Sequence, residues 1–267
     1  MAEFSAKDVK ALRDDTGAGM MDAKKALTAT DGDYAEAVVW LRERGLGKAA
    51  ERAGRDNTEG AVSVAVADGA GALVELKSES DFVAKSPQFV GTADQLAQAV
   101  ATEGEAAIDA HKDAVDDLRL TLKENIEVGK VVRFVADPGD VLETYLHVQN
   151  GRGVNGVLVE IAGGDLELAH DIAVHIAFGK PSHLQRDDVP AEEVEAERAA
   201  LEAQTRNEGK PEQALPKIVD GKLNGWYKRI PGGVLLEQPY AKDDKQTVSD
   251  VLGDARVVRF AQAVVGT

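Results

Sequence analysis

The chain has 267 residues, a net charge of −16 and no cysteine. Its length exceeds that of a usual compact domain and predicts two or three folding units. Without cysteine there are no disulfides, thiolate metal sites or cysteine nucleophiles. The acidic surface argues against direct nucleic-acid binding. No apolar run has the length of a signal peptide or a membrane span, so we expect a cytoplasmic protein without a membrane partner.

The first 55 residues predict a small helical module. Ser5 and Asp8 have the spacing of a capping box, and the glycine-containing segments Thr16–Gly19 and Asp31–Asp33 interrupt the helical pattern. Three helices are expected: one after Ser5, one over Met20–Ala29, and one over Tyr34–Arg44 that ends at Gly45. The charged segment Gly47–Gly60 is expected to be a helical linker.

Residues 56–138 predict a first α+β unit. Ala61–Ala67 and Ala72–Ser78 alternate as strands do, and Asp68–Gly71 between them favours a hairpin turn. The segment Ser80-Asp81-Phe82-Val83 follows and is expected to be a loop tip. Two helices, Ser86–Thr102 and Val115–Leu122, and a strand over Val131–Val135 complete the unit.

Residues 139–267 predict a second α+β unit that repeats the order of hairpin and helix, which suggests an internal structural duplication. Its expected elements are strands Val141–Val148, Val154–Ala162, Val234–Leu236 and Arg256–Val265, and helices Leu166–Phe178 and Val248–Leu252. Residues 190–230 interrupt the unit. Helices over Ala191–Glu208 and Glu212–Trp226, joined at Gly209–Pro211, predict an inserted antiparallel coiled-coil hairpin.

Signatures of catalysis and of cofactor binding do not match. There is no GxxxxGK[ST] phosphate loop. Gly151, Gly153 and Gly156 form a GxGxxG pattern, but they lie between two predicted strands, which favours a hairpin loop. His170 and His175 are five residues apart rather than the four that place two ligands on one helix face. We therefore expect no enzyme activity, no cofactor and no metal.

Two longer motifs are more specific. Leu12–Leu27 contains TGAGMMDAKKAL, and Glu75–Lys85 reads ELKSESDFVAK. Both resemble the elongation factor Ts family, whose members carry TGAGMMDxKKAL in an N-terminal ubiquitin-associated-like module and a later segment ending in TDFVAK. Ser80 replaces the usual threonine and keeps the hydroxyl. The expected order of module, two core subdomains and inserted hairpin also fits the family.

The resemblance implies a guanine nucleotide exchange factor for the GTPase elongation factor Tu in translation. The residues Ser80, Asp81, Phe82 and Val83 then form the tip that displaces magnesium and GDP. In that reading Phe82 acts as a wedge, whereas without the motif it would be interpreted as core packing.

Other partner contacts are implied by the same resemblance. Met20, Met21 and Lys24 match the family's N-terminal contact surface, although one methionine in the core is the alternative. His147 resembles the contact histidine of the second subdomain, but Val148–Asn150 departs from the family's loop, and an ordinary strand histidine is equally consistent. The helical hairpin could contact the partner or a second copy of the chain. Some members continue into a C-terminal helical module, whose contacts are expected to be absent or replaced after Thr267.

Two other functions are compatible with the sequence. An adaptor that binds peptides through the N-terminal bundle would explain Met20 and Met21 but not Asp81 and Phe82. An enzyme with an unrecognised carboxylate site is permitted by the acidic composition but supported by no spacing.

Overall fold

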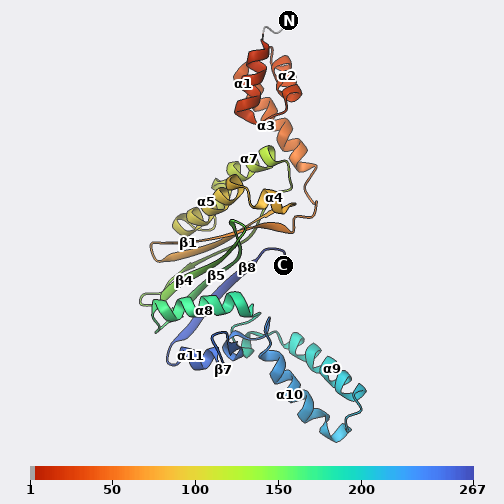
Figure 1. Cartoon of the computed structure of the whole chain (residues 1–267), viewed down its shortest axis with the longest axis vertical. Helices are drawn as coiled ribbons and strands as arrows, with labels where there is room; N and C mark the ends of the chain where they lie inside the picture. The colour runs from red at the N-terminus through yellow and green to blue at the C-terminus, as the bar shows by residue number, and fades with distance from the viewer. Residues whose placement is uncertain (1–3) are drawn as a thin grey trace.

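The computed structural model describes residues 4–267, with the side chains of Leu46 and Lys48 left outside the description. The chain is an α+β protein that begins with three helices (Figure 1). These are α1 (Ala6–Thr16), α2 (Met20–Ala29) and α3 (Tyr34–Ala50). None of the helices in the described part of the chain is long and apolar enough to cross a membrane.

The start of the helical module follows the sequence prediction. Ser5 and Asp8 form a capping box, in which the Ser5 N–H donates to Asp8 Oδ2 over 2.8 Å. Gly17 ends α1 in the left-handed conformation at φ 64°. Val9 and Leu12 are buried and pack against α2 and α3.

The expectation that α3 ends at Gly45 is wrong, because the helix continues to Ala50. Gly45 lies against the Leu120 side chain, where a Cβ would have no room. The glycine therefore permits close packing between α3 and a later helix and does not terminate α3. Only the first residues of the predicted linker Gly47–Gly60 are helical, and an extended strand already begins at Glu59.

The first sheet has the antiparallel order β1-β2-β3. Its strands are β1 (Glu59–Ala67), β2 (Ala70–Ser78) and β3 (Glu127–Val135). Asp68 and Gly69 make the predicted hairpin turn with φ 50° and 76°. Between β2 and β3 lie α4 (Asp81–Ala84), α5 (Pro87–Glu103), α6 (Ala107–Ala110) and α7 (Lys112–Leu122). The predicted inward face of α5 is buried against the sheet.

The second sheet has the antiparallel order β4-β5-β8. Its strands are β4 (Val141–Gln149), β5 (Arg152–Ala162) and β8 (Arg256–Val264), and α8 (Leu166–Gly179) follows β5. In both sheets, a hairpin is followed by a helix, and a third strand pairs with the second strand of the hairpin.

The two sheets pack face to face, with α5 on the outside of one and α8 on the outside of the other (Figure 1). Val62, Leu73 and Leu158 form part of the apolar layer between them. Gly156 lies against Val62, where a Cβ would clash with that side chain. The central strands, β2 and β5, are buried on both faces, because each contributes side chains to two cores. This double burial explains why both strands are rich in apolar residues.

The segment between α8 and β8 contains the two predicted helices of the hairpin and several short elements that the sequence did not predict. Helices α9 (Ala191–Asn207) and α10 (Leu215–Tyr227) lie side by side, run in opposite directions and project from the body (Figure 1). Around them are the short elements η1 (Arg186–Asp188), η2 (Glu212–Ala214), η3 (Leu235–Glu237), β6 (Pro239–Tyr240), β7 (Asp243–Thr247) and α11 (Val248–Leu252).

The predicted strand Val234–Leu236 is wrong. Leu235–Glu237 is a turn of 3₁₀ helix, and Val234 makes only a single bridge to His183. Leu235 is apolar because it packs into the core beneath α8, and not because it belongs to a sheet. A short apolar run does not distinguish these two causes of burial.

A buried histidine fixes the base of the α9–α10 hairpin. His175 Nε2 lies 3.0 Å from Gln238 Oε1, and its Nδ1 accepts the Ala241 N–H over 3.1 Å. The Gln238 amide then donates to the carbonyls of Gly179 and Arg229, both over 3.0 Å. His175 is therefore held as the neutral ring with its proton on Nε2.

We expect acid to destabilise the protein through His175. Burial lowers the pKa of this histidine below its ordinary value of 6.5. As the pH falls below 6.5 the unfolded chain takes up a proton that the folded chain resists, so the free energy of unfolding decreases by up to about 1.4 kcal/mol per pH unit. Urea unfolding between pH 7.5 and 5.5 measures this slope. His175→Asn, which retains an acceptor for Ala241 N–H, should have a shallower slope; an equal slope would contradict the assignment.

Candidate functional site

Asp81, Phe82 and Val83 are the first residues of the one-turn helix α4, and Ser80 is its N-cap, which corrects the expected loop tip. Ser80 caps this helix, and its Oγ accepts the Val83 N–H over 3.3 Å. Val83 and Ala84 are buried in the first core, whereas the Phe82 side chain is 75% exposed. Phe82 is therefore not a core residue. We call Ser80 and the four residues of α4 the tip turn.

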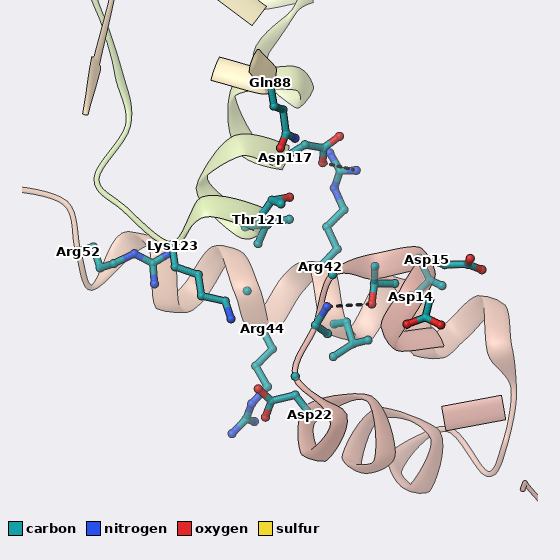
Figure 2. Close-up of a pocket in the computed structure, with 18 residues that line it drawn as sticks. Asp14, Asp15, Asp22, Arg42, Arg44, Arg52, Gln88, Asp117, Thr121 and Lys123 are labelled. Carbon is teal, nitrogen blue, oxygen red and sulfur yellow. Dashed lines mark hydrogen bonds and ion pairs between the residues drawn. The ribbon is translucent and has the colours of Figure 1, made fainter. Parts of the chain in front are cut away.

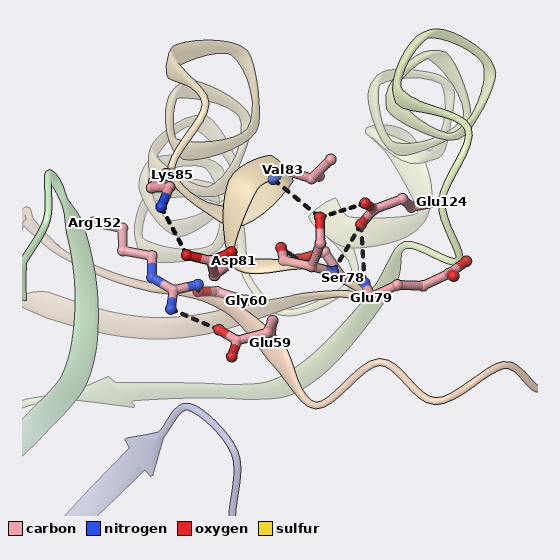
Figure 3. Close-up of polar contacts among 10 residues, drawn as sticks. Glu59, Gly60, Ser78, Glu79, Asp81, Val83, Lys85, Glu124 and Arg152 are labelled. Carbon is pink, nitrogen blue, oxygen red and sulfur yellow. Dashed lines mark hydrogen bonds and ion pairs between the residues drawn. The ribbon is translucent and has the colours of Figure 1, made fainter.

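Glu124 holds the tip turn in place (Figure 3). One oxygen of its carboxylate accepts the backbone N–H groups of Glu79 and Ser80, each over 3.0 Å, and the other accepts the Ser80 hydroxyl. Glu124 lies in the loop between α7 and β3. Three charge-assisted hydrogen bonds thus fix the backbone just before Phe82, so the exposed ring extends from a rigid support.

A second contact reinforces this support. The Glu79 carboxylate accepts the Asn125 N–H over 2.6 Å and lies 3.6 Å from the Arg55 guanidinium. Asn125 in turn donates its side-chain amide to the Arg55 carbonyl over 2.9 Å. The tip turn, the α7–β3 loop and the segment that leads into β1 are therefore joined in one network.

Asp81 is exposed and lies between two cations (Figure 3). Lys85 Nζ is 2.7 Å from Asp81 Oδ2, and the guanidinium of Arg152 lies close by. The hydrogen bond and charge of Lys85, with a smaller contribution from Arg152, lower the pKa of Asp81. The carboxylate is therefore ionised at neutral pH beside an exposed aromatic ring.

Met20, Met21 and Lys24 lie together on one face of α2. The two methionines are 44% and 63% exposed, and Lys24 is also exposed, so neither methionine belongs to the small core of the module. Flexible thioether side chains that face solvent are typical of surfaces that bind other proteins.

A cleft of about 660 Å³ adjoins the start of α2, between the helical module and α7 (Figure 2). Its lining includes Gly19, just before α2, and Thr121 of α7. Arg42 spans the junction, with nitrogens 2.8 Å from Asp113 and 3.4 Å from Asp117. These ion pairs join the module to the rest of the chain at one end of the cleft.

His147 is exposed near the end of β4, at the point where the register with β5 shifts. It pairs with Asn155 in the sheet, and Val148 beside it is also exposed. No hydrogen bond or ion pair within the described part of the chain joins His147, the tip turn and the α2 surface to one another. The expected contact residues are thus carried by three different elements, α2, α4 and β4.

Three contributors to the site were missed by the sequence reasoning. Lys85 could have been found, because it is four residues after Asp81 and helical spacing brings the two together. Glu124 and Arg152 could not, because they are 44 and 71 positions away from the residues they support and no local pattern marks them.

One cluster of acidic groups lies elsewhere, where Asp137, Asp140 and Glu160 have carboxylate oxygens within 4.8 Å of one another. Glu160 is fully buried; one of its oxygens is 2.6 Å from Arg259 Nε, and the other accepts the Asp137 N–H over 2.9 Å. Arg259 also donates to the Val135 carbonyl over 2.7 Å. This cluster joins the two sheets.

Comparisons with known proteins identify relatives of the chain over its whole length. The family model described as elongation factor TS matches residues 79–267. The chain is 43% identical over 281 residues to elongation factor Ts of Clavibacter michiganensis subsp. michiganensis, with both chains fully covered. It is 45% identical to that of Acidothermus cellulolyticus, covering 100% of this chain and 99% of the relative, and 44% identical to that of Streptomyces griseus subsp. griseus, with both fully covered.

An exposed aromatic side chain on a rigid support is the kind of anchor on which protein interfaces rely. The chain belongs to the elongation factor Ts family, whose members are factors of translation elongation.

Proposed function

We propose that this chain is a guanine nucleotide exchange factor that binds elongation factor Tu and promotes GDP release in the cytoplasm. The observation that carries the proposal is the exposed Phe82 ring beside an ionised Asp81 on a turn that Glu124 holds rigid. Membership of the elongation factor Ts family supplies the identity of the partner.

Exchange of this kind breaks no covalent bond in the factor or in its partner. The factor binds the nucleotide-free GTPase more tightly than the GDP-bound form, and by reciprocity GDP then binds more weakly to the complex. A thousandfold weakening requires about 4 kcal/mol of differential binding. Burying one large aromatic ring supplies about 1.5–3 kcal/mol, so a wider interface must contribute the remainder.

The two residues of the tip turn have different roles in this proposal. Phe82 inserts as a wedge between side chains of the GTPase, and Ser80 and Val83 hold it in position. Asp81 brings negative charge toward the magnesium ion and the phosphates of the partner, where it disturbs the coordination of the cation and repels the phosphates.

The other exposed surfaces complete the proposed interface. Met20, Met21 and Lys24 on α2 contact the GTPase through the N-terminal module, and His147 contacts it from the second sheet. The position of these residues on three different elements supports a protein partner. The proposal includes no direct contact with nucleic acid and no catalytic group.

We also propose how the chain is divided. Residues 1–55 form a ubiquitin-associated-like module, residues 56–138 the first core subdomain, and residues 139–267 the second, with 190–230 as an inserted coiled-coil hairpin. The shared order of hairpin, helix and third strand supports a duplication of the two subdomains. Pairing of a second copy through α9 and α10 is the alternative use of the hairpin, and sedimentation equilibrium of the free protein distinguishes it from a monomer.

Equilibrium binding tests the linkage directly. Titration calorimetry should give a dissociation constant for nucleotide-free elongation factor Tu that is about 1,000-fold lower than that for the GDP-bound form. Equal affinities for the two forms would contradict an exchange function, because a ligand with no preference between two states cannot shift them.

The α2 surface should contribute affinity. Replacing Met20 and Met21 together with alanine is expected to weaken binding of nucleotide-free elongation factor Tu about 10- to 100-fold, because two exposed apolar side chains lose their contact area. Calorimetry measures the change. Val66→Ala, at a half-exposed position of β1, is the control. Unchanged affinity in the double variant would remove α2 from the interface.

A further inference from the structure

Arg152 belongs to the second sheet but binds the first. It begins β5 directly after the β4–β5 turn, and its guanidinium donates to the Gly60 carbonyl over 2.8 Å and to Glu59 Oε2 over 2.6 Å. The side chain is only 12% exposed. Two hydrogen bonds from one planar group fix both its position and its orientation.

The backbone beside Arg152 is also fixed. Gly153 lies so close to the Val62 carbonyl of β1 that no Cβ would fit there. The β4–β5 turn is therefore seated directly on the first strand of the first sheet. The Arg152 guanidinium, which belongs to the second sheet, is therefore held at a fixed position on the first strand of the first sheet.

This position of the Arg152 guanidinium is next to the tip turn. Figure 3 shows the Arg152 guanidinium between the carboxylates of Glu59 and Asp81. Lys85, the other cation at Asp81, is on the same chain segment as Asp81 and moves with it. Arg152 bonds to Glu59 and Gly60 and acts on Asp81 through its charge. Of the two cations near Asp81 it is the one that comes from the second sheet, so its charge relates Asp81 to the surface that carries His147.

We propose that Arg152 is a positioning residue whose charge orients the Asp81 carboxylate. It thereby fixes the tip turn relative to the second sheet when both contact the same partner. This inference rests on the proposed exchange function. Arg152 itself does not contact the nucleotide site of the GTPase, because its guanidinium is largely buried between Glu59 and Gly60.

A double-mutant cycle separates positioning from simple structural support. Arg152→Met keeps the apolar stem and removes the charge. At saturating factor it should lower the maximal rate of GDP release about tenfold when Asp81 is present, with little change in KM, and less than about twofold when Asp81→Asn has already been introduced. Equal losses in both backgrounds, or no loss in either, would overturn the proposal.

Arg152→Lys provides a second variant if Arg152→Met is unstable. It keeps the charge but not the paired hydrogen bonds, and should recover part of the lost rate. Thermal unfolding of each variant shows whether the fold is retained. A lysine variant that folds as the parent does but is as slow as a neutral one would contradict a role for charge.

A readout on the free protein distinguishes failure of this inference from failure of the exchange function. The carboxyl carbon of Asp81 can be titrated by NMR without any partner, and its midpoint should rise in Arg152→Met and fall back in Arg152→Lys. An unchanged midpoint overturns the inference even if the parent protein exchanges GDP. A shifted midpoint in a protein that does not exchange supports the effect of the Arg152 charge on Asp81 and rejects the proposed function.

Discussion

Replacing Phe82 with alanine is expected to slow GDP release from elongation factor Tu about 30- to 1,000-fold at limiting factor. Truncating a central aromatic anchor of an interface typically costs about 2–4 kcal/mol, which corresponds to that range. The ring is 75% exposed in the free protein, so its loss should leave the free energy of unfolding nearly unchanged. Stopped-flow fluorescence of labelled GDP measures the rate.

Leu166→Ala is the matched control, because Leu166 is also a largely exposed apolar residue but lies at the start of α8 in the second sheet's layer. It should exchange like the parent. If Phe82→Ala also exchanges at the parental rate while remaining folded, the wedge assignment is wrong even if the family membership stands.

The second large effect is expected on stability, from Arg259→Met. This change leaves the fully buried Glu160 carboxylate without the guanidinium that lies 2.6 Å from it. The Arg259 side chain is itself 43% exposed, so we expect the cost of leaving one buried acceptor without its partner, about 1–3 kcal/mol. The same guanidinium also stacks on Phe134, 4.5 Å from the ring centre, and binds the Val135 carbonyl, so contact between the two sheets weakens as well.

Urea unfolding monitored by circular dichroism measures the loss. Arg256→Met is the control, because Arg256 is an exposed arginine on the same strand and its replacement should change stability by less than about 0.5 kcal/mol. A loss in Arg259→Met no larger than in Arg256→Met would show that Glu160 is stabilised in some other way.

Local sequence signals predicted the regular parts of the fold well. The helices α2 and α11 begin and end at the predicted residues, and both hairpins form, because glycines, caps and apolar alternation act over a few residues. The errors have tertiary causes. Gly45 resembles a helix end but lies against Leu120. Val234 packs at the base of the α9–α10 hairpin and Leu235 packs under α8, so this apolar run is buried without being paired in a sheet.

The candidate site divides in the same way. The motif that contains Asp81 and Phe82 could be recognised from the sequence, and so could the exposed surface around Met20 and Met21. The residues around the tip turn could not, because Glu124, which binds it, and Arg152, whose charge acts on Asp81, come near it only after the chain has folded. The expected loop tip is a helical turn because Ser80 caps it and Val83 anchors it in the core.

The competing functions fit the structure less well. A peptide adaptor would use the α2 surface but would give no reason for an exposed aromatic ring on a rigid support far along the chain. A carboxylate enzyme would need free acidic groups at its cluster, whereas both oxygens of Glu160 already bind Arg259 and the Asp137 N–H. Exchange on a GTPase accounts for both surfaces together.

The most direct measurement is the release of labelled GDP from elongation factor Tu with this protein at about one-hundredth of the GTPase concentration and unlabelled GDP in excess. The proposed function predicts that each molecule of the factor acts many times, so that all the labelled GDP is lost much faster than without it. Release at the uncatalysed rate, or release of only an amount equal to the factor added, would contradict it.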